Sequence, residues 1–384
     1  MRADFRKDFS GNSYRGGAAA ALGISLLVLG MLALSLAVDV GGASAQTNPP
    51  PEPGISNETC LGCHGAPDQT LTLPSGEVVY LSVDPEVYNN SIHGEQGYAC
   101  VQCHTDITGY PHPALEAKTR RELTVSMYQA CGRCHQGMYE QTQDSVHAEA
   151  RANGNLNAAV CSDCHGAHDI RPFSEKPRSA VPQTCERCHS QIYEAYKTSV
   201  HGAALLGEGN PDVPDCTSCH GVHNLQGPID PDFHLKSPEI CAGCHTDETL
   251  MAKYGLSTDV LDTYLADFHG TTVMFESEIP GQETNKPVCV DCHGVHDMQK
   301  TDDPNSIKEN LLVTCQKCHP DATPNFSGAW LGHYEPSPKN YPLIYYIQLF
   351  YLIFIPGLLG LMAVFVVTDA GRRIINRRKE VKHE

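Results

Sequence analysis

Apolar residues in this chain gather in two long segments near its ends, while the region between them is polar. The first segment covers residues 18–38, and the second covers residues 342–368, which contain no charged side chain. About eighteen apolar residues in a row are enough to predict a helix that crosses a membrane. From residue 60 to residue 340 the chain is rich in glycine and proline and has few aliphatic runs, so its side chains alone would build only a small core.

The N-terminal segment has the order of a secretory signal. Basic residues come first, the apolar stretch follows, and Ala43-Ser44-Ala45 comes next. This order, with its Ala-x-Ala site, is typical of a cleaved signal. We therefore predict a signal peptide at residues 1–45 and a stiff, proline-rich spacer at residues 46–59. An uncleaved anchor helix is the alternative, because the apolar stretch is longer than in most signals. Both would export the segment that follows.

The C-terminal segment is predicted to be a single membrane-spanning helix at residues 342–368. Four tyrosines at its start form an interfacial aromatic belt, and a basic tail, residues 369–384, follows it. The positive-inside rule then places the tail in the cytoplasm and the polar region on the periplasmic, extracytoplasmic side. Residues 334–341 would be a juxtamembrane linker. A buried core helix is the alternative, and Pro356 with Gly357 predicts a kink.

The polar region repeats the pentapeptide Cys-x-x-Cys-His nine times, and the nine motifs contain all eighteen cysteines. This pentapeptide attaches c-type haem through its two thiols, and its histidine becomes the proximal iron ligand. Zinc sites or disulfides are the alternative for paired Cys-x-x-Cys. However, histidine is 20 of 384 residues and should follow a given Cys-x-x-Cys only about one time in twenty. We therefore predict nine covalently attached haem c groups.

The predicted attachment sites share one pattern, in which two cysteines precede the proximal histidine. The attachment cysteines are Cys60, Cys63, Cys100, Cys103, Cys131, Cys134, Cys161, Cys164, Cys185, Cys188, Cys216, Cys219, Cys241, Cys244, Cys289, Cys292, Cys315 and Cys318. The proximal iron ligands are His64, His104, His135, His165, His189, His220, His245, His293 and His319.

Nine haems in this region leave roughly thirty-three residues for each, far below the size of an ordinary domain. The haems themselves must then provide the core, because burial of their apolar faces replaces the missing aliphatic area. We expect a mainly α and irregular fold at residues 60–333, with short helices and loops around a haem stack and little sheet. The C-terminal transmembrane helix would complete it.

Alignment of the motifs gives four and a half copies of one unit, which begin at Cys60, Cys131, Cys185, Cys241 and Cys315. Each copy has a histidine after its first motif, and each complete copy has another after its second. The nine candidate distal ligands are His93, His112, His147, His168, His201, His223, His269, His296 and His333. A hydrogen-bonding role is the alternative for each of them. It is preferred for His234, which has no counterpart in other copies, and His383 lies in the tail.

Chain geometry limits which haem each distal histidine reaches. If residues 185–204 form one helix, His201 lies about 18 Å beyond His189 and cannot easily reach the far side of the same haem. His223 follows His220 by only three residues, which is too short to pass around a macrocycle. We therefore expect both to bind neighbouring haems. His333 is expected to serve the Cys315 site, which would make that haem the one nearest the membrane.

Three motifs resemble those of periplasmic multihaem cytochromes c with bis-histidine ligation, including the cytochrome c3-like and decahaem families. They are Cys-x-x-Cys-His, Ser-Val-His-Gly at residues 199–202, and Cys-His-Gly-x-His ending at His168, His223 and His296. The resemblance covers roughly residues 60–333. The C-terminal end, with His333 and Tyr334 before a tyrosine-rich span and a basic tail, is similar to multihaem subunits beside a membrane cytochrome b in quinol-oxidising complexes.

The resemblance implies an electron carrier of anaerobic respiration that connects the membrane quinone pool with an extracytoplasmic acceptor. Its expected partners are a membrane cytochrome b or quinol dehydrogenase subunit and an extracytoplasmic redox protein. No catalytic side chain is predicted, because the chain has no nucleophile elbow, P-loop or dinucleotide fingerprint. A structural or haem-storage role is disfavoured, since storage gives no reason for matched distal ligands.

The alternative is a reductase with one five-coordinate catalytic haem that acts on a small nitrogen or sulfur oxyanion. Reductases of this kind typically carry a Cys-x-x-Cys-Lys motif, which is absent here. The spacing in copy 1 favours the reductase alternative. His112 follows His104 by eight residues, whereas in the other complete copies the distal candidate follows the second motif histidine by three. If His112 does not bind iron, one haem has an open position.

Charge follows the same boundaries as the apolar pattern. The chain carries −18, its first 45 residues carry +1 and its last 16 carry +3, which leaves −22 for the region between them. An acidic surface argues against nucleic acid as a partner and favours soluble partners with basic patches. Solubility alone is the other interpretation of this charge.

A first test is the haem count. The intact mass of the mature protein should show nine covalent haem additions, because nine complete motifs are present and no cysteine is left over. Eight or fewer additions in fully matured protein, or zinc in place of iron, would contradict the interpretation of the motifs.

Overall fold

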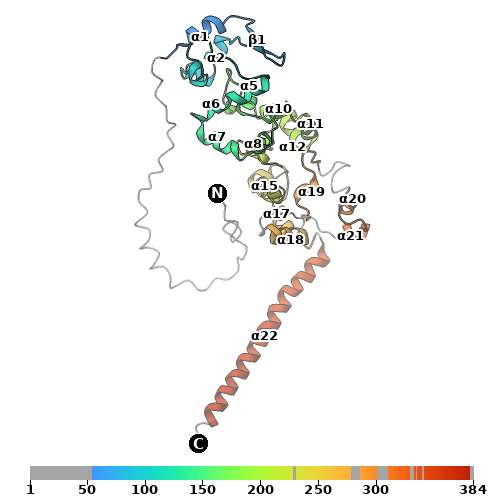
Figure 1. Cartoon of the computed structure of the whole chain (residues 1–384). Helices are drawn as coiled ribbons and strands as arrows, with labels where there is room; N and C mark the ends of the chain where they lie inside the picture. The colour runs from blue at the N-terminus through green and yellow to red at the C-terminus, as the bar shows by residue number, and fades with distance from the viewer. Residues whose placement is uncertain are drawn as a thin grey trace. The chain divides into compact units, whose positions relative to one another are not determined.

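The computed structural model describes residues 54–227, 231–277, 286–300, 310–328, 333, 335–339 and 341–380. These belong to one contact unit, Glu52–Glu384. The predicted signal peptide at residues 1–45, most of the spacer and His383 lie outside the described residues. Figure 1 shows the described part as many short helices joined by loops, with one long C-terminal helix.

The first two copies of the repeat contain the only two strands of the described residues and nine helices. Copy 1 comprises α1 (Asn57–His64), β1 (Thr70–Thr72), β2 (Val78–Tyr80), α2 (Pro85–Asn89), α3 (Ile92–Glu95) and α4 (Cys100–Cys103). Copy 2 comprises α5 (Arg120–Met127), α6 (Gln129–Gly132), α7 (Gln136–Gln143), α8 (Val146–Ala152) and α9 (Cys161–His165). The strands form one antiparallel hairpin, in which Thr70 is paired with Tyr80.

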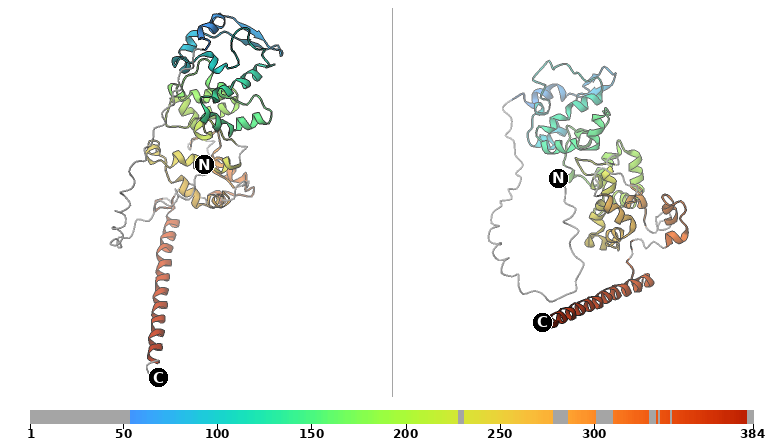
Figure 2. Two further views of the ribbon diagram at one scale, coloured as in Figure 1. Left: turned by 60° about the vertical axis from the view of Figure 1, so that its left-hand side comes forward. Right: turned by 60° about the horizontal axis from the view of Figure 1, so that its bottom comes forward.

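The later copies are helical throughout their described residues. Copy 3 comprises η1 (Phe173–Glu175), α10 (Ala180–Glu186), α11 (Ser190–Thr198), α12 (Val200–Glu208) and α13 (Cys216–His220). Copy 4 and the half copy comprise α14 (Pro231–Leu235), α15 (Ser237–His245), α16 (Glu248–Ala252), α17 (Val260–Ala266), α18 (Phe268–Ser277), α19 (Cys289–His293), α20 (Leu311–Gln316) and α21 (Pro324–Gly328). Two further views show the same succession of short elements (Figure 2). The mainly helical and irregular fold class is confirmed.

Few apolar side chains of the described residues are fully buried. They are Leu73, Ala158, Val160, Tyr196, Leu205, Ala242, Met251, Val273, Val288 and Ala322. Most are small, and they are scattered over all four copies and the half copy instead of forming one cluster. The protein side chains therefore provide only a small apolar core, as the composition predicted.

Residues 185–204 do not form one helix, so that expectation is wrong. The chain forms α11 and then α12, and the break between them lies at Ser199, whose backbone is extended with ψ of 164°. The Ser199 hydroxyl accepts the Gly202 N–H at 3.0 Å and donates to the Tyr196 carbonyl at 2.7 Å. A serine hydroxyl satisfies free N–H groups at a helix start, so it favours a new helix over continuation of the old one.

The same break recurs in copies 1, 2 and 4, before the histidine that follows the first motif. Ser91 caps α3 and Ser145 caps α8, and each accepts the N–H three residues ahead at 3.1 and 3.2 Å. In copy 4, Asp267 takes this position and accepts the Phe268 N–H at 2.6 Å. All three serines are buried, and each hydroxyl forms a hydrogen bond, so their burial does not leave a polar group without a partner.

A glycine turn follows the second motif in copies 2, 3 and 4. Gly166, Gly221 and Gly294 have φ of 82°, 81° and 82° with ψ close to 180°. This backbone region is open essentially only to glycine. In copy 1 the equivalent residue is Thr105, so the same turn cannot form there.

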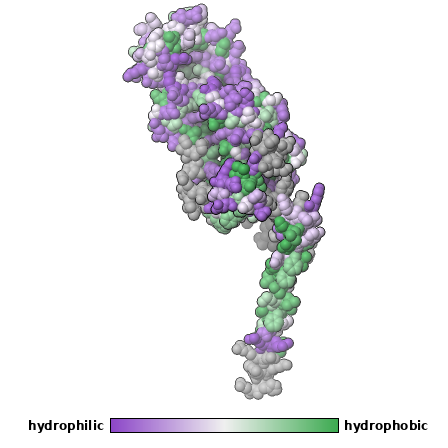
Figure 3. Space-filling model, turned by 90° about the vertical axis from the view of Figure 1, so that its right-hand side faces the viewer, coloured by the Kyte–Doolittle hydropathy of each residue, from purple (hydrophilic) through white to green (hydrophobic). Residues whose placement is uncertain are grey.

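The C-terminal helix α22 spans Pro342–Glu380. Its segment Pro342–Ile375 has a mean hydropathy of 2.5 and is not buried by the rest of the chain, so by length and composition it is a candidate membrane span. Figure 3 shows this apolar surface, which ends in a hydrophilic stretch. The helix continues through Pro356, and the kink expected at Pro356 and Gly357 stays a prediction. Two further views show α22 as one long helix (Figure 2).

The glycine turn can be tested by stability. Gly221→Ala should lower the free energy of unfolding by about 1–3 kcal/mol, because alanine is strained at this backbone geometry. Gly207→Ala, in the last turn of α12 with open space where a Cβ would lie, should instead raise it by about 0.5–1 kcal/mol. Thermal unfolding followed by circular dichroism measures both. Equal effects of the two variants would show that the turn is not constrained.

Candidate haem-ligand sites

Each Cys-x-x-Cys-His motif lies on a helix or at a helix end. Second motifs start their own short helices, for example α9 and α13, whereas first motifs lie towards the ends of helices such as α1 and α15. Residues three and four positions apart share one face of a helix. The spacing therefore presents both thiols and the histidine ring to the same side, which is the arrangement that a covalently attached haem requires.

Every motif histidine lies opposite one of the nine candidate distal histidines, with ring centres 5.9–6.3 Å apart. The pairs are His64–His112 (5.9 Å), His135–His93 (6.0 Å), His104–His168 (6.1 Å), His189–His147 (6.1 Å), His165–His223 (6.2 Å), His245–His201 (6.3 Å), His220–His296 (6.1 Å), His319–His269 (6.3 Å) and His293–His333 (6.0 Å). The two sets match one to one, and no member is left over.

This separation fits one metal ion between two imidazoles. Two metal–nitrogen bonds of about 2 Å, with about 1.2 Å from each nitrogen to its ring centre, give about 6.4 Å between ring centres. The residues present therefore fit haem iron held from both sides. Within the described residues no group of three or more histidine, cysteine or acidic side chains is arranged around a metal position, and all eighteen cysteines are free. Four-ligand zinc sites and disulfides thus find no support.

Several of the paired histidines are oriented by backbone carbonyls. The Nδ1 atoms of His64 and His220 lie 2.9 and 2.8 Å from the carbonyls of Leu81 and Gln226, and His112 Nδ1 lies 2.9 Å from the Gly109 carbonyl. A carbonyl only accepts, so Nδ1 carries the proton and donates. Nε2 then keeps its lone pair for a metal. A histidine that ligates a metal usually donates its other ring N–H to a carbonyl in this way.

Burial favours the neutral form of several of the paired histidines. It lowers the pKa of His201 to about 4, and repulsion from His245 adds to this effect. Burial likewise lowers the pKa of His245 and is the largest cause of the lowered pKa of His293. Neutral imidazole is the form that binds metals, so these positions are prepared for ligation at neutral pH.

The pairs connect consecutive copies in both directions. The histidine after a first motif lies opposite the first motif of the next copy, as in His93–His135, His147–His189, His201–His245 and His269–His319. The histidine after a second motif lies opposite the second motif of the preceding copy, as in His168–His104, His223–His165 and His296–His220. His201 and His223 therefore face neighbouring sites, as expected, although the single helix assumed in the case of His201 does not form.

The two ends of the repeat depart from this rule. Copy 1 has no preceding copy, and its His112 lies opposite His64 of the same copy. Because Thr105 replaces the turn glycine, the chain runs on past Gly109 before it presents this histidine, which accounts for the longer spacing. At the other end His333 lies opposite His293, so the expectation that it serves the Cys315 site is wrong. His319 of that site already faces His269 from α18.

Comparisons with known proteins agree with these sites. Residues 92–190, which contain four complete motifs, match the family model described as cytochrome c3. The chain is 25% identical over 137 residues to the multiheme cytochrome MtrA of Shewanella baltica, and 24% identical over 178 residues to the cytochrome c-type protein NrfB of Escherichia coli. This chain is a multihaem c-type cytochrome. The matches cover 35% and 44% of this chain, 32% of MtrA and 71% of NrfB.

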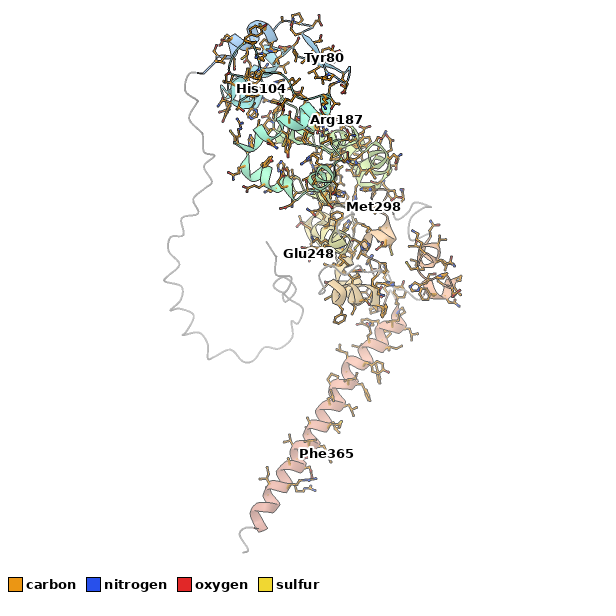
Figure 4. The ribbon with its side chains drawn as sticks, in the orientation of Figure 1. Tyr80, His104, Arg187, Glu248, Met298 and Phe365 are labelled. Atoms are coloured by element: carbon orange, nitrogen blue, oxygen red, sulfur yellow. The ribbon has the colours of Figure 1, made fainter. Side chains whose placement is uncertain are left out.

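A backbone hydrogen bond links consecutive copies of the cytochrome beside the distal ligands. The N–H groups of Ile92, Val146 and Val200 donate to the carbonyls of Ile170, Leu225 and Met298 at 2.8–2.9 Å. Each donor directly precedes one distal histidine, and each acceptor lies two residues after another. Met298 is labelled in Figure 4, where the side chains of the described residues are drawn. Two distal ligands from different copies are thus fixed relative to one another at three equivalent junctions.

His234 of the cytochrome faces no motif histidine. Its Nε2 lies 2.9 Å from Asp291 of the fourth copy's second motif, which supports the hydrogen-bonding role predicted for it. It does have a structural counterpart, which the sequence reasoning missed. Arg178 binds Asp215 beside the second motif of copy 3 at 3.0 Å, and it precedes Cys185 by seven residues, as His234 precedes Cys241. Alignment of basic residues, instead of histidines alone, would have found this match.

The pairing can be tested with variants that omit one haem. In a Cys241→Ala, Cys244→Ala background, His201→Ala should add no further high-spin haem, because the site that His201 faces is already lost. In a Cys185→Ala, Cys188→Ala background the same substitution should open one haem. Magnetic circular dichroism of the ferric protein counts high-spin haems. The reverse dependence would assign His201 to its own copy and overturn the pairing.

Proposed function

We propose that this cytochrome is a nonahaem electron carrier, anchored in the cytoplasmic membrane with its haem region on the extracytoplasmic side. It transfers electrons between the quinone pool, through a membrane partner subunit, and an extracytoplasmic acceptor. The observation that carries the proposal is the pairing of all nine motif histidines with nine other histidines at a separation that fits iron.

Two axial histidines at every site favour electron transfer over substrate chemistry. A haem iron held between two imidazoles takes up and releases one electron while it keeps both ligands. Here the two histidines of most sites come from different copies, and helix caps or backbone hydrogen bonds hold the chain beside several of them, so little rearrangement accompanies a change of charge. With both axial positions filled, no position is left for a substrate.

Neighbouring thiols support a continuous series of sites. In each copy the first cysteines of the two motifs lie close enough for one thiol to shift the pKa of the other, as in Cys60 and Cys100, Cys131 and Cys161, Cys185 and Cys216, and Cys241 and Cys289. Between copies, Cys103 interacts with Cys134, Cys164 with Cys185, Cys219 with Cys241 and Cys292 with Cys315. Each attachment site therefore adjoins the next along the chain, as conduction from one end to the other requires.

The membrane assignment rests on the predicted export signal, on α22 and on the basic tail. The candidate span contains no histidine for a b-type haem and no charged side chain between residues 342 and 368 to handle quinol protons. Quinol chemistry therefore belongs to a partner, of the membrane cytochrome b or quinol dehydrogenase class.

The reductase alternative loses the observation that favoured it. It required His112 to be free of iron, but His112 lies 5.9 Å from His64 with nearly parallel rings, at an interplanar angle of 18°. Its Nδ1 is held by the Gly109 carbonyl, so Nε2 is free for the site. No described motif histidine lacks an opposite histidine, and the open haem has no candidate.

The electron port towards the membrane is assigned to the end of the repeat nearest α22 along the chain. Nine residues separate His333 from Pro342, so even an extended linker reaches only about 30 Å. His333 faces the Cys289 site, so this linker holds that site close to α22, and the Cys315 site adjoins it. Both sites form the proposed port.

The port can be tested in membranes. His333→Ala should slow reduction of the whole haem series by quinol, because it opens and perturbs the Cys289 site, while dithionite still reduces the remaining haems. His112→Ala opens one haem at the opposite end and is the matched control, whose initial quinol-driven rate should be unchanged. An unchanged rate in His333→Ala, or an equal loss in both variants, would place electron entry elsewhere.

A further inference from the structure

The nine histidine pairs fall into two classes by the angle between their ring planes. Pairs whose distal histidine follows a second motif are close to parallel, with angles of 22–24° for His168, His223 and His296. Pairs whose distal histidine follows a capped helix start are tilted, with angles of 51°, 52° and 38° for His93, His201 and His269. His147 belongs to the second group by position, but its pair has an angle of only 27°.

The three tilted sites share a glycine directly after the distal histidine. A Cβ at Gly94, Gly202 or Gly270 would lie only 1.9–2.1 Å from a carbonyl oxygen of the preceding helix. Such an approach is closed to every other residue, so glycine lets the start of the ligand helix lie directly against the end of the helix before it. The carbonyl belongs to Tyr88, Tyr196 or Tyr264, which always stands six residues earlier.

The same tyrosines connect the ligand helix to the second motif. The hydroxyls of Tyr88, Tyr196 and Tyr264 donate to the carbonyls of Tyr98, Pro214 and Pro287 at 2.7, 2.7 and 3.0 Å. Each acceptor stands two residues before the first cysteine of a second motif. Tyrosine and glycine together thus fix how the distal histidine's helix sits within its copy.

Copy 2 departs from this arrangement at both positions. Ala148 replaces the glycine and Thr142 replaces the tyrosine. The missing phenol hydrogen bond is taken over by Arg151, whose guanidinium donates to the Ala159 carbonyl and lies over the Tyr128 ring. Because Ala148 has a Cβ, α8 cannot approach the Thr142 carbonyl as closely as its counterparts approach theirs.

We propose that the residue after the distal histidine sets the rotation of that imidazole, and that Ala148 makes the His147–His189 site electronically distinct from the three sites with glycine. Ala148 is a positioning residue, since it acts through the helix that carries His147 and does not itself touch the iron site. The inference rests on the proposed bis-histidine ligation.

The consequence follows from how two axial imidazoles act on one ferric low-spin iron. When the two ring planes are parallel, both imidazoles interact through their π systems with the same iron d orbital, which separates that orbital in energy from the other d orbital of π symmetry. When the planes are strongly tilted, the two d orbitals stay closer in energy. The orientation of ligands by their surroundings is a recognised means of tuning a metal. The orbital separation sets the spread of g values in electron paramagnetic resonance, so the site with Ala148 should give a more rhombic signal than the tilted sites.

The experiment is to remove the Cβ. In Ala148→Gly, and more fully in Thr142→Tyr with Ala148→Gly, the signal of one haem in nine should move from the rhombic set to the set with the larger maximum g value. Ala152→Gly, the same change at an exposed position of α8, should leave the spectrum unchanged. Haem content and the low-spin optical spectrum should be the same in all variants.

The outcomes separate the two proposals. If the variants keep nine low-spin haems and neither changes the g values, the role of Ala148 is overturned while the proposed function stands. If the wild-type protein lacks bis-histidine low-spin signals, the proposed function itself fails. Gly202→Ala tests the converse in copy 3. A fully folded variant with unchanged g values would also overturn the inference.

Discussion

The exchange of histidines between copies is the constraint on which the rest of this structure depends. Individual copies have few buried apolar residues and could not form a core alone. Each copy presents one histidine forward and one backward, so its sites are complete only when its neighbours are in place. The caps at Ser91, Ser145 and Ser199, the glycine turns and the backbone hydrogen bonds between copies all serve to hold these histidines at the required separation.

Local sequence accounts for much of this arrangement. Repeat alignment alone selected nine distal candidates, and the structure places each of them opposite a motif histidine; their role as ligands stays a prediction that the variants above test. The short spacing between His220 and His223 also predicted that His223 faces a neighbouring site, whereas the same expectation for His201 agreed with the structure although the single helix on which it rested does not form. These inferences succeeded because they depend on distances along the chain, which a sequence contains directly.

Two other inferences failed for reasons that are physical. His333 was assigned to the nearest motif in the chain, but the end of a repeat has no next copy to receive its histidines, and the available position is at His293. The single helix expected over residues 185–204 ignored Ser199, whose hydroxyl ends one helix and starts another. The counterpart of His234 was overlooked because only histidines were aligned, although Arg178 stands at the same distance from its motif.

The irregular ends determine how such a molecule can change its size. An internal copy receives two histidines from its neighbours and provides two histidines to them. Insertion or deletion of a whole internal copy therefore leaves the numbers of motif histidines and distal histidines equal. His112 and His333 are the exceptions, because each closes an end that has no further neighbour. They act as the terminal caps of a solenoid. With a half copy at one end, this architecture grows by two haems at a time and keeps an odd number, while every site retains a histidine on both sides.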